Sequence, residues 1–95
     1  MATVVGLLHL RLYVAQAGSL KDKRQVIKSF KDRLGRCGNL AVAEVDSLDD
    51  RRQAVLAVAM VSNDRRHLES SLQQVVNAAA RHRDMILVDH EIEWL

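Results

Sequence analysis

The chain contains few of the residues that mark specialised classes of protein. Its 95 residues include no proline, one cysteine, and one each of Phe, Tyr and Trp. The lone cysteine, Cys37, has no disulfide partner within the chain, which fits a reducing compartment. The longest apolar run, residues 54–61, is far shorter than the ~20 residues that span a bilayer, and the N-terminus lacks a signal-peptide pattern. These absences predict a single cytoplasmic domain, residues 1–95, without membrane contact.

Hydrophobic spacing predicts two units of strand, helix and strand. Residues 4–14, 40–45 and 85–94 read as strands, and the apolar run at 54–61 reads as another. Apolar residues three to four apart predict an amphipathic helix after Ser19 and a second one after Asp64. The order βαββαβ predicts an α+β fold, the ferredoxin-like two-layer sandwich. Right-handed crossovers then predict an antiparallel sheet in the order 4-1-3-2.

Helix boundaries are indicated by capping residues. Ser19 is the predicted N-cap of the first helix, and Asp22 three residues later approaches a capping box. Gly35 predicts a left-handed residue at the end of that helix. Asn63 or Asp64 is the predicted cap of the second helix.

Both helices are expected to cover one face of the sheet, above Leu8, Leu10, Leu12, Ile86 and Val88. Alternation then places five other apolar side chains on the opposite, open face: Val5, Leu7, Tyr13, Met85 and Leu87. The pattern leaves open which side of the strand at 54–61 faces the helices. No predicted element covers the open face, and a contiguous exposed apolar patch usually marks an interface. We therefore expect a homodimer through these five residues.

Positive charge is concentrated in the first helix. The chain has 14 Lys and Arg against 12 Asp and Glu, but on a helical wheel Lys21, Arg24, Lys28 and Lys31 form one stripe. Lys23 falls on the apolar side of the wheel and lies close to a strand-to-helix loop, 15–19, whose backbone amides could hold an anion. These five residues are the candidate nucleic-acid or anion-binding site. A solvated helix face, with lysine stems covering the rim of the core and an ordinary cap before it, also explains them.

No set of residues suggests a reaction centre. His9, His67, His82 and His90 are not spaced as ligands, so neither a metal nor a cofactor is expected. Cys37 follows a helix end, where the dipole disfavours a thiolate. Glu44 and Asp46 share a strand face by alternation and could form a carboxylate pair, although protection of a sheet edge explains them better. Tyr13 is the single aromatic residue on the central strands, too few for base stacking on the sheet.

Several segments together resemble the YlxP family of small bacterial proteins of unknown function. The matching segments are 4–8 (VVGLL), 19–24 (SLKDKR), 43–46 (AEVD), 61–64 (VSND) and 87–93 (LVDHEIE). The resemblance implies a cytoplasmic ferredoxin-like domain with no established activity and no catalytic residues to carry over. It also implies a link to RNA or ribosomes, because genes of this family often lie near those for transcription elongation, translation initiation and ribosome maturation factors. The chain departs from the family in the hairpin after the second strand, where Ser47 and Arg51 replace a histidine and an aromatic residue.

Three functional hypotheses follow. The leading one is a non-catalytic binding protein that contacts RNA or a ribosomal particle through its basic first helix, in ribosome assembly or translation. The second is a small enzyme of the acylphosphatase type, which shares this topology, although loop 15–19 lacks the arginine and glycine-rich cradle of such enzymes. The third is a dimerising scaffold without nucleic-acid contact.

Overall fold

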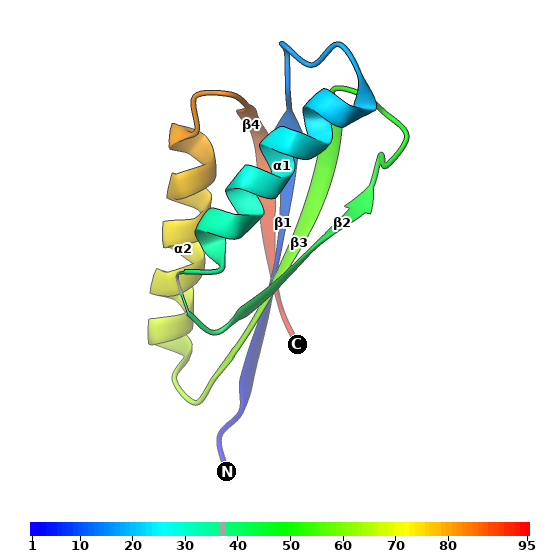
Figure 1. Cartoon of the computed structure of the whole chain (residues 1–95). Helices are drawn as coiled ribbons and strands as arrows, with labels where there is room; N and C mark the ends of the chain where they lie inside the picture. Colours follow the sequence, from blue (N-terminus) through cyan, green and yellow to red (C-terminus); the bar gives the residue numbers. More distant parts are fainter. Residues whose placement is uncertain (37) are drawn as a thin grey trace.

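The computed structural model describes residues 1–36 and 38–95, so Cys37, where no reactive thiolate is expected, lies outside the described residues. The elements are β1 (Val4–Tyr13), α1 (Leu20–Leu34), β2 (Leu40–Asp46), β3 (Gln53–Ser62), α2 (Arg65–Arg81) and β4 (Ile86–Trp94) (Figure 1). All three strand pairings are antiparallel, and the sheet order is β2-β3-β1-β4. The predicted ferredoxin-like α+β fold and its 4-1-3-2 order are therefore confirmed.

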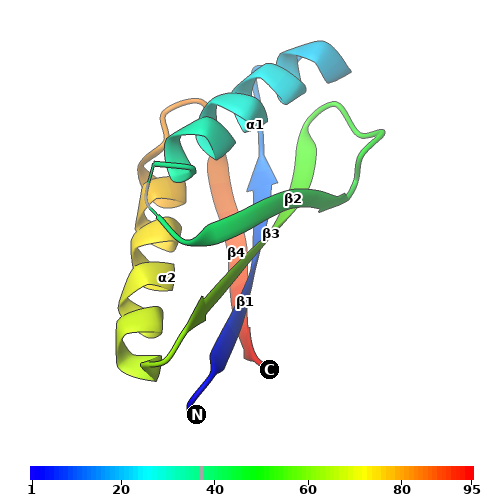
Figure 2. The same ribbon diagram turned by 60° about the horizontal axis from the view of Figure 1, so that its bottom comes forward.

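Both helices lie on the same face of a strongly twisted sheet (Figures 1 and 2). Every second residue of β1 packs beneath them, at Leu8, Leu10 and Leu12. The alternation did not determine which side of β3 faces the helices. In the structure, that side carries Ala54, Leu56, Val58 and Met60, which are buried. The apolar sides of the helices complete this core, at Ile27, Phe30, Leu34, Leu68, Leu72, Val75, Val76 and Ala79. Neither described helix is long and apolar enough to cross a membrane.

The predicted facing of β4 is wrong over its first half, because the strand contains a bulge. Arg11 of β1 pairs with Asp89, whereas its neighbour Leu12 pairs with Leu87, so Val88 is an extra residue. Met85 is 5% exposed and Leu87 packs against the core. Ile86 and Val88, predicted beneath the helices, are instead 57% and 62% exposed. Met85 and Leu87 are therefore not part of the open face.

The two helix N-termini follow the capping prediction. Ser19 Oγ accepts a hydrogen bond from the Asp22 amide (3.1 Å), and Asp22 Oδ2 accepts one from the Gly18 amide (2.9 Å). Asp64 Oδ1 caps α2 by accepting from the amides of Arg66 and His67 (3.0 and 3.3 Å). These bonds satisfy amides that a helix itself leaves unpaired.

The prediction for the end of α1 is wrong in its geometry. Gly35 has φ −58° and ψ −18°, which is right-handed helical backbone, and its amide donates to Lys31 O at 2.9 Å. Among the described residues, positive φ angles occur at Gly38 (105°) and at Ser47 (59°). Among the described residues after α1, the left-handed glycine is therefore Gly38 and not Gly35.

Candidate functional site

Lys23, one of the five predicted anion ligands, is buried inside the fold. Its side chain is 0% exposed, and Nζ donates to Glu44 Oε2 (2.9 Å), Ser47 O (2.9 Å) and Gln53 O (3.0 Å). All three hydrogens of the ammonium group are thus used within the chain. The prediction that Lys23 contacts a nucleic acid or an external anion is wrong, because the group is inaccessible. Its place on the apolar side of the helical wheel was the signal for this buried position.

The expectation that Glu44 and Asp46 share a strand face is wrong. Glu44 pairs across the sheet with Leu56, whose side chain faces the helices, whereas Asp46 pairs with Val55 on the open side. A bulge between Glu44 and Asp46 puts the two carboxylates on opposite faces. Glu44 therefore serves as the partner of Lys23, and Asp46 Oδ1 accepts from the amide of Ser47 (2.7 Å).

The turn between β2 and β3 uses the carboxylate of Asp50 in a similar way. Asp50 Oδ1 accepts from the amides of Arg52 and Gln53 at 2.8 and 2.9 Å. These two hydrogen bonds lower the pKa of the Asp50 carboxyl below its usual value of 3.8. The acidic groups of this turn thus hold its backbone.

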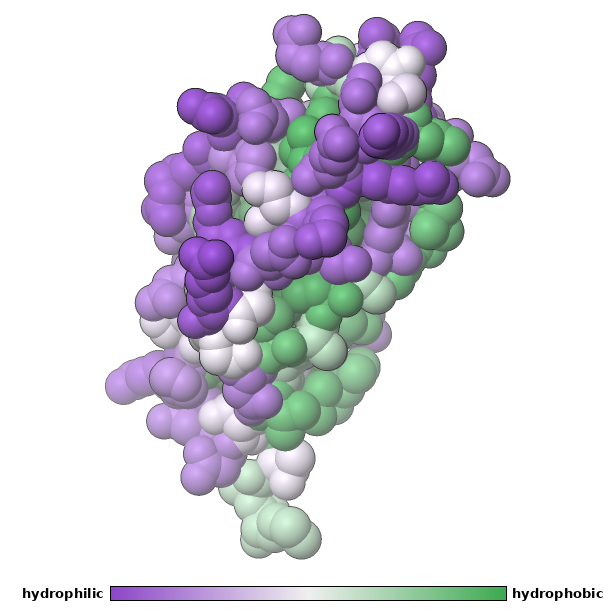
Figure 3. Space-filling view, in the orientation of Figure 1, coloured by the Kyte–Doolittle hydropathy of each residue, from purple (hydrophilic) through white to green (hydrophobic). Residues whose placement is uncertain are grey.

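The other four predicted cations lie at the surface of α1. Lys21, Arg24 and Lys28 are exposed, and Lys31 is partly exposed. Lys28 forms an exposed ion pair with Asp32 (2.9 Å), whereas no ion pair of the described residues involves Lys21, Arg24 or Lys31. Figure 3 shows hydrophilic side chains covering α1, with hydrophobic surface beside it over the strands. The outer side of α1 is therefore open to an anionic partner.

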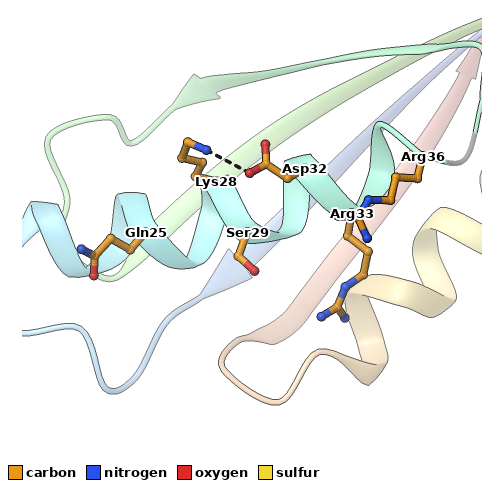
Figure 4. Close-up of a pocket in the computed structure, with 6 residues that line it drawn as sticks. All are labelled: Gln25, Lys28, Ser29, Asp32, Arg33 and Arg36. Carbon is orange, nitrogen blue, oxygen red and sulfur yellow. Dashed lines mark hydrogen bonds and ion pairs between the residues drawn. The ribbon is translucent and has the colours of Figure 1, made fainter.

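Further cations gather where α1 approaches the end of α2. A shallow hollow of about 430 Å³ lies on α1 between Lys28, Arg33 and Arg36, with Gln25, Ser29 and Asp32 as its other lining residues. In Figure 4 Arg33 extends from α1 toward the end of α2. A second hollow of about 370 Å³ shares Ser29 and Arg33 and is completed by Arg81, His82, Arg83 and Asp84. Sequence analysis missed Arg81 and Arg83 as site residues because only the packing of the two helices brings them beside Arg33.

His82 forms part of the second hollow without adding charge to it. The residue is 7% exposed, and its ring meets the ring of Phe30 edge-on at 6.0 Å. Nδ1 accepts a hydrogen bond from the Asp84 amide (3.2 Å), which requires that this nitrogen carry no proton. Burial lowers the pKa of His82 below its usual 6.5, and the nearby charge of Arg33 lowers it further. His82 is thus a neutral ring in the lining of this hollow.

The opposite side of the molecule carries the acidic groups. Strand pairing places Asp89, Glu91 and Glu93 of β4 beside Arg11, His9 and Leu7 of β1, on the sheet face away from the helices. Val5, Leu7 and Tyr13 lie on this same face, as predicted, and each is partly buried. Trp94 lies instead on the helix side, 4.5 Å beneath the Arg65 guanidinium. The described residues contain no group of three His, Cys, Asp or Glu side chains placed to hold a metal.

These features define a small α+β protein with a cationic helix layer and an acidic outer strand. Residues 5–92 match the family described as "Protein of unknown function (DUF503)", and the chain belongs to this family. The chain is also 30% identical over 73 residues to "Uncharacterized protein YlxP" of Bacillus subtilis (strain 168), covering 77% of this chain and 79% of that protein. The resemblance noted from the sequence is therefore confirmed.

Two solved structures share the fold. The de novo designed protein Foldit4 has a TM-score of 0.57 and 16% identity, covering 98% of this chain and 96% of that one. SnoaB, a cofactor-independent oxygenase from Streptomyces nogalater, has a TM-score of 0.59 and 15% identity, covering 97% and 92%. At such low identity the likeness extends to the fold alone.

Proposed function

We propose that this protein is a non-catalytic RNA-binding protein that contacts phosphate groups with the helix layer. The observation that supports this proposal is the cationic face. It is defined as the basic surface residues of α1 and of the segment just after it, the last residue of α2 and one arginine beyond it: Lys21, Arg24, Lys28, Lys31, Arg33, Arg36, Arg81 and Arg83. The three carboxylates near this face, Asp22, Asp32 and Asp84, offset only part of the charge of its eight basic residues.

The charge arrangement supports an extended polyanion as the partner. Each phosphate that a lysine or arginine neutralises releases condensed counterions, which favours binding at low salt. The acidic side chains of β4 lie on the other side of the sheet, so a polyanion is attracted to the helix layer and repelled from that strand. Few aromatic residues are available for stacking, so the contact is electrostatic and tolerant of sequence. The gene neighbourhood implied by the family resemblance favours RNA, and hence action in the cytoplasm.

A charge-matched pair of variants tests the proposal. One variant carries Lys21→Gln, Arg24→Gln, Lys28→Gln and Lys31→Gln. Its control carries Ser70→Glu, Gln73→Glu, Gln74→Glu and Asn77→Glu on the exposed side of α2. Each set lowers the net charge by four, from +2 to −2, but only the first removes cations from the proposed contact.

Binding of a ribosomal RNA fragment is measured by fluorescence anisotropy over a salt series. The first variant is expected to lose roughly tenfold or more in affinity, and its slope of log affinity against log salt to shrink by about 3, at ~0.7 per contact. The control is expected to keep the slope of the wild type. Equal losses in both variants, or no salt-dependent binding by the wild type, would contradict the proposal.

A further inference from the structure

The sheet face away from the helices, called here the open face, carries an uncovered apolar surface. Its rows are set by strand pairing: Ala41, Ala59 and Leu7 lie side by side, and Val61 lies beside Val5. Three of the exposed large apolar residues also belong to it, since Val61 is 49%, Ile86 57% and Val88 62% exposed. Within the described residues, no helix or loop packs over these strands from this side.

We propose that the open face packs against the open face of a second copy of this chain. This inference is independent of the proposed RNA contact, because the cationic face lies on the helix side of the sheet. In the resulting dimer the two sheets form the centre and the two helix layers lie outside.

The area of the open face suits a stable dimer. β1 and β3 each have ten residues, and four strands at ~4.8 Å spacing and ~3.3 Å rise cover roughly 600 Å². Stable interfaces bury roughly 600 to 1,000 Å² on each partner. The accessible surface of the chain, 6073 Å², exceeds by about a tenth the ~5,500 Å² expected of a monomer of this mass. The molecule thus exposes more surface than its size requires.

The distribution of side chains favours an identical partner. On the β2 and β3 half, strand pairing places four small uncharged side chains side by side: Ala41, Ala43, Ala57 and Ala59. Two copies of such a surface are complementary to each other about a two-fold axis. The acidic row of Asp89, Glu91 and Glu93 is confined to β4, so like charges disfavour stacking β4 on β4. The alanine-rich half therefore forms the centre of the interface, and β4 of each copy lies toward its rim.

The test compares two alanine-to-glutamate substitutions in the full chain. Ala59→Glu puts a carboxylate into the alanine-rich half, and Ala80→Glu puts one on the exposed side of α2. The solution mass is measured by sedimentation over a concentration series. The wild type and Ala80→Glu are expected to have twice the chain mass, while Ala59→Glu dissociates with a Kd raised roughly a hundredfold or more. Val61→Glu, at a half-exposed position, is expected to behave like Ala59→Glu, and circular dichroism verifies the fold of each variant.

Salt separates this interface from a purely electrostatic one. A dimer built on the open face is expected to persist at high salt, because apolar contacts are not screened. Dissociation at high salt would indicate that the cationic α1 of one copy binds the acidic β4 of another, which contradicts the proposal. A wild-type monomer at every concentration, or an Ala59→Glu variant that dimerises like the wild type, would also overturn it.

Discussion

Lys23 of α1 and Glu44 of β2 form an ion pair whose lysine is completely enclosed, with Nζ and Oε2 2.9 Å apart and the glutamate side chain 13% exposed. Lys28, five residues later on the same helix, meets Asp32 at the same distance, but both side chains are more than 60% exposed. The first pair joins α1 to the edge strand and, through Ser47 O and Gln53 O, to the turn that follows it. The two lysines therefore provide a matched comparison of a buried pair and a surface pair.

We expect Lys23→Met to destabilise the fold by about 3 kcal/mol, because it leaves Glu44 and two backbone carbonyls without their donor. Lys28→Met is expected to change the free energy of unfolding by less than about 0.5 kcal/mol. Urea denaturation of both variants measures the difference. A double variant, Lys23→Met with Glu44→Leu, is expected to recover part of the loss, since it removes the uncompensated charge. Equal effects of Lys23→Met and Lys28→Met on the free energy of unfolding would show that burial of Lys23 adds nothing to the stability.

Stability is expected to depend on pH through His82. Its pKa in the folded chain is lowered from 6.5, chiefly by burial and then by the charge of Arg33. The unfolded chain therefore binds a proton at higher pH than the folded chain does. Neutral His82 thus contributes to the free energy of unfolding, and this contribution is complete above about pH 6.5 and is lost as the pH falls through the lowered pKa. His82→Gln is expected to reduce the fall in unfolding free energy between neutral and mildly acid pH, whereas the exposed His67→Gln keeps it. An NMR titration that places the His82 midpoint at or above 6.5 would contradict this account.

Both helix caps are expected to contribute measurably to stability. Ser19→Ala and Asp64→Ala are each expected to lower the free energy of unfolding by about 1 kcal/mol, because they remove side-chain acceptors for amides of the first turn. Ser70→Ala, at an exposed position inside α2, is the control and is expected to be neutral or slightly stabilising. Urea denaturation provides the values. Equal free energies of unfolding for Ser19→Ala, Asp64→Ala and Ser70→Ala would show that neither cap stabilises its helix.

At Gly6, β1 lies close to side chains of α2 and β4. A Cβ atom at this position meets Leu72 Cδ1 at 2.8 Å and Trp94 Cζ3 at 3.0 Å. Gly6→Ala is therefore expected to cost about 1–3 kcal/mol through overpacking. At Gly18 the nearest atom to such a Cβ is Asp22 Oδ2 at 3.5 Å, so Gly18→Ala is the control and is expected to be tolerated. Thermal denaturation in which Gly6→Ala melts no lower than Gly18→Ala would contradict the expectation.

Local features of the sequence predicted the fold well. Periodicity placed the six elements in their order. Ser19 was identified as one cap, and the other was narrowed to Asn63 or Asp64, because a cap depends on residues within one turn of helix. The strand order followed from the handedness of crossovers. The facing of β4 could not be predicted in the same way, because a bulge at Val88 shifts the alternation and no local signal announces it.

The candidate site was predicted in part. The exposed stripe of Lys21, Arg24 and Lys28 could be found on a helical wheel, since helical spacing alone puts these residues on one side. The same wheel showed that Lys23 was out of place, but its partner Glu44 lies 21 residues away. The neighbourhood of Arg33 and Arg81 depends on the contact of two helices, which periodicity does not describe.

The sequence by itself determined the order, type and caps of the elements, because these depend on hydrogen bonds and apolar spacing within short segments. Only the tertiary structure decided which carboxylate meets Lys23, which side chains of β4 face outward, and which arginines meet across the helices. These features depend on contacts between segments distant in the chain and on bulges. One extra residue in a strand reverses which face of the sheet the side chains after it occupy.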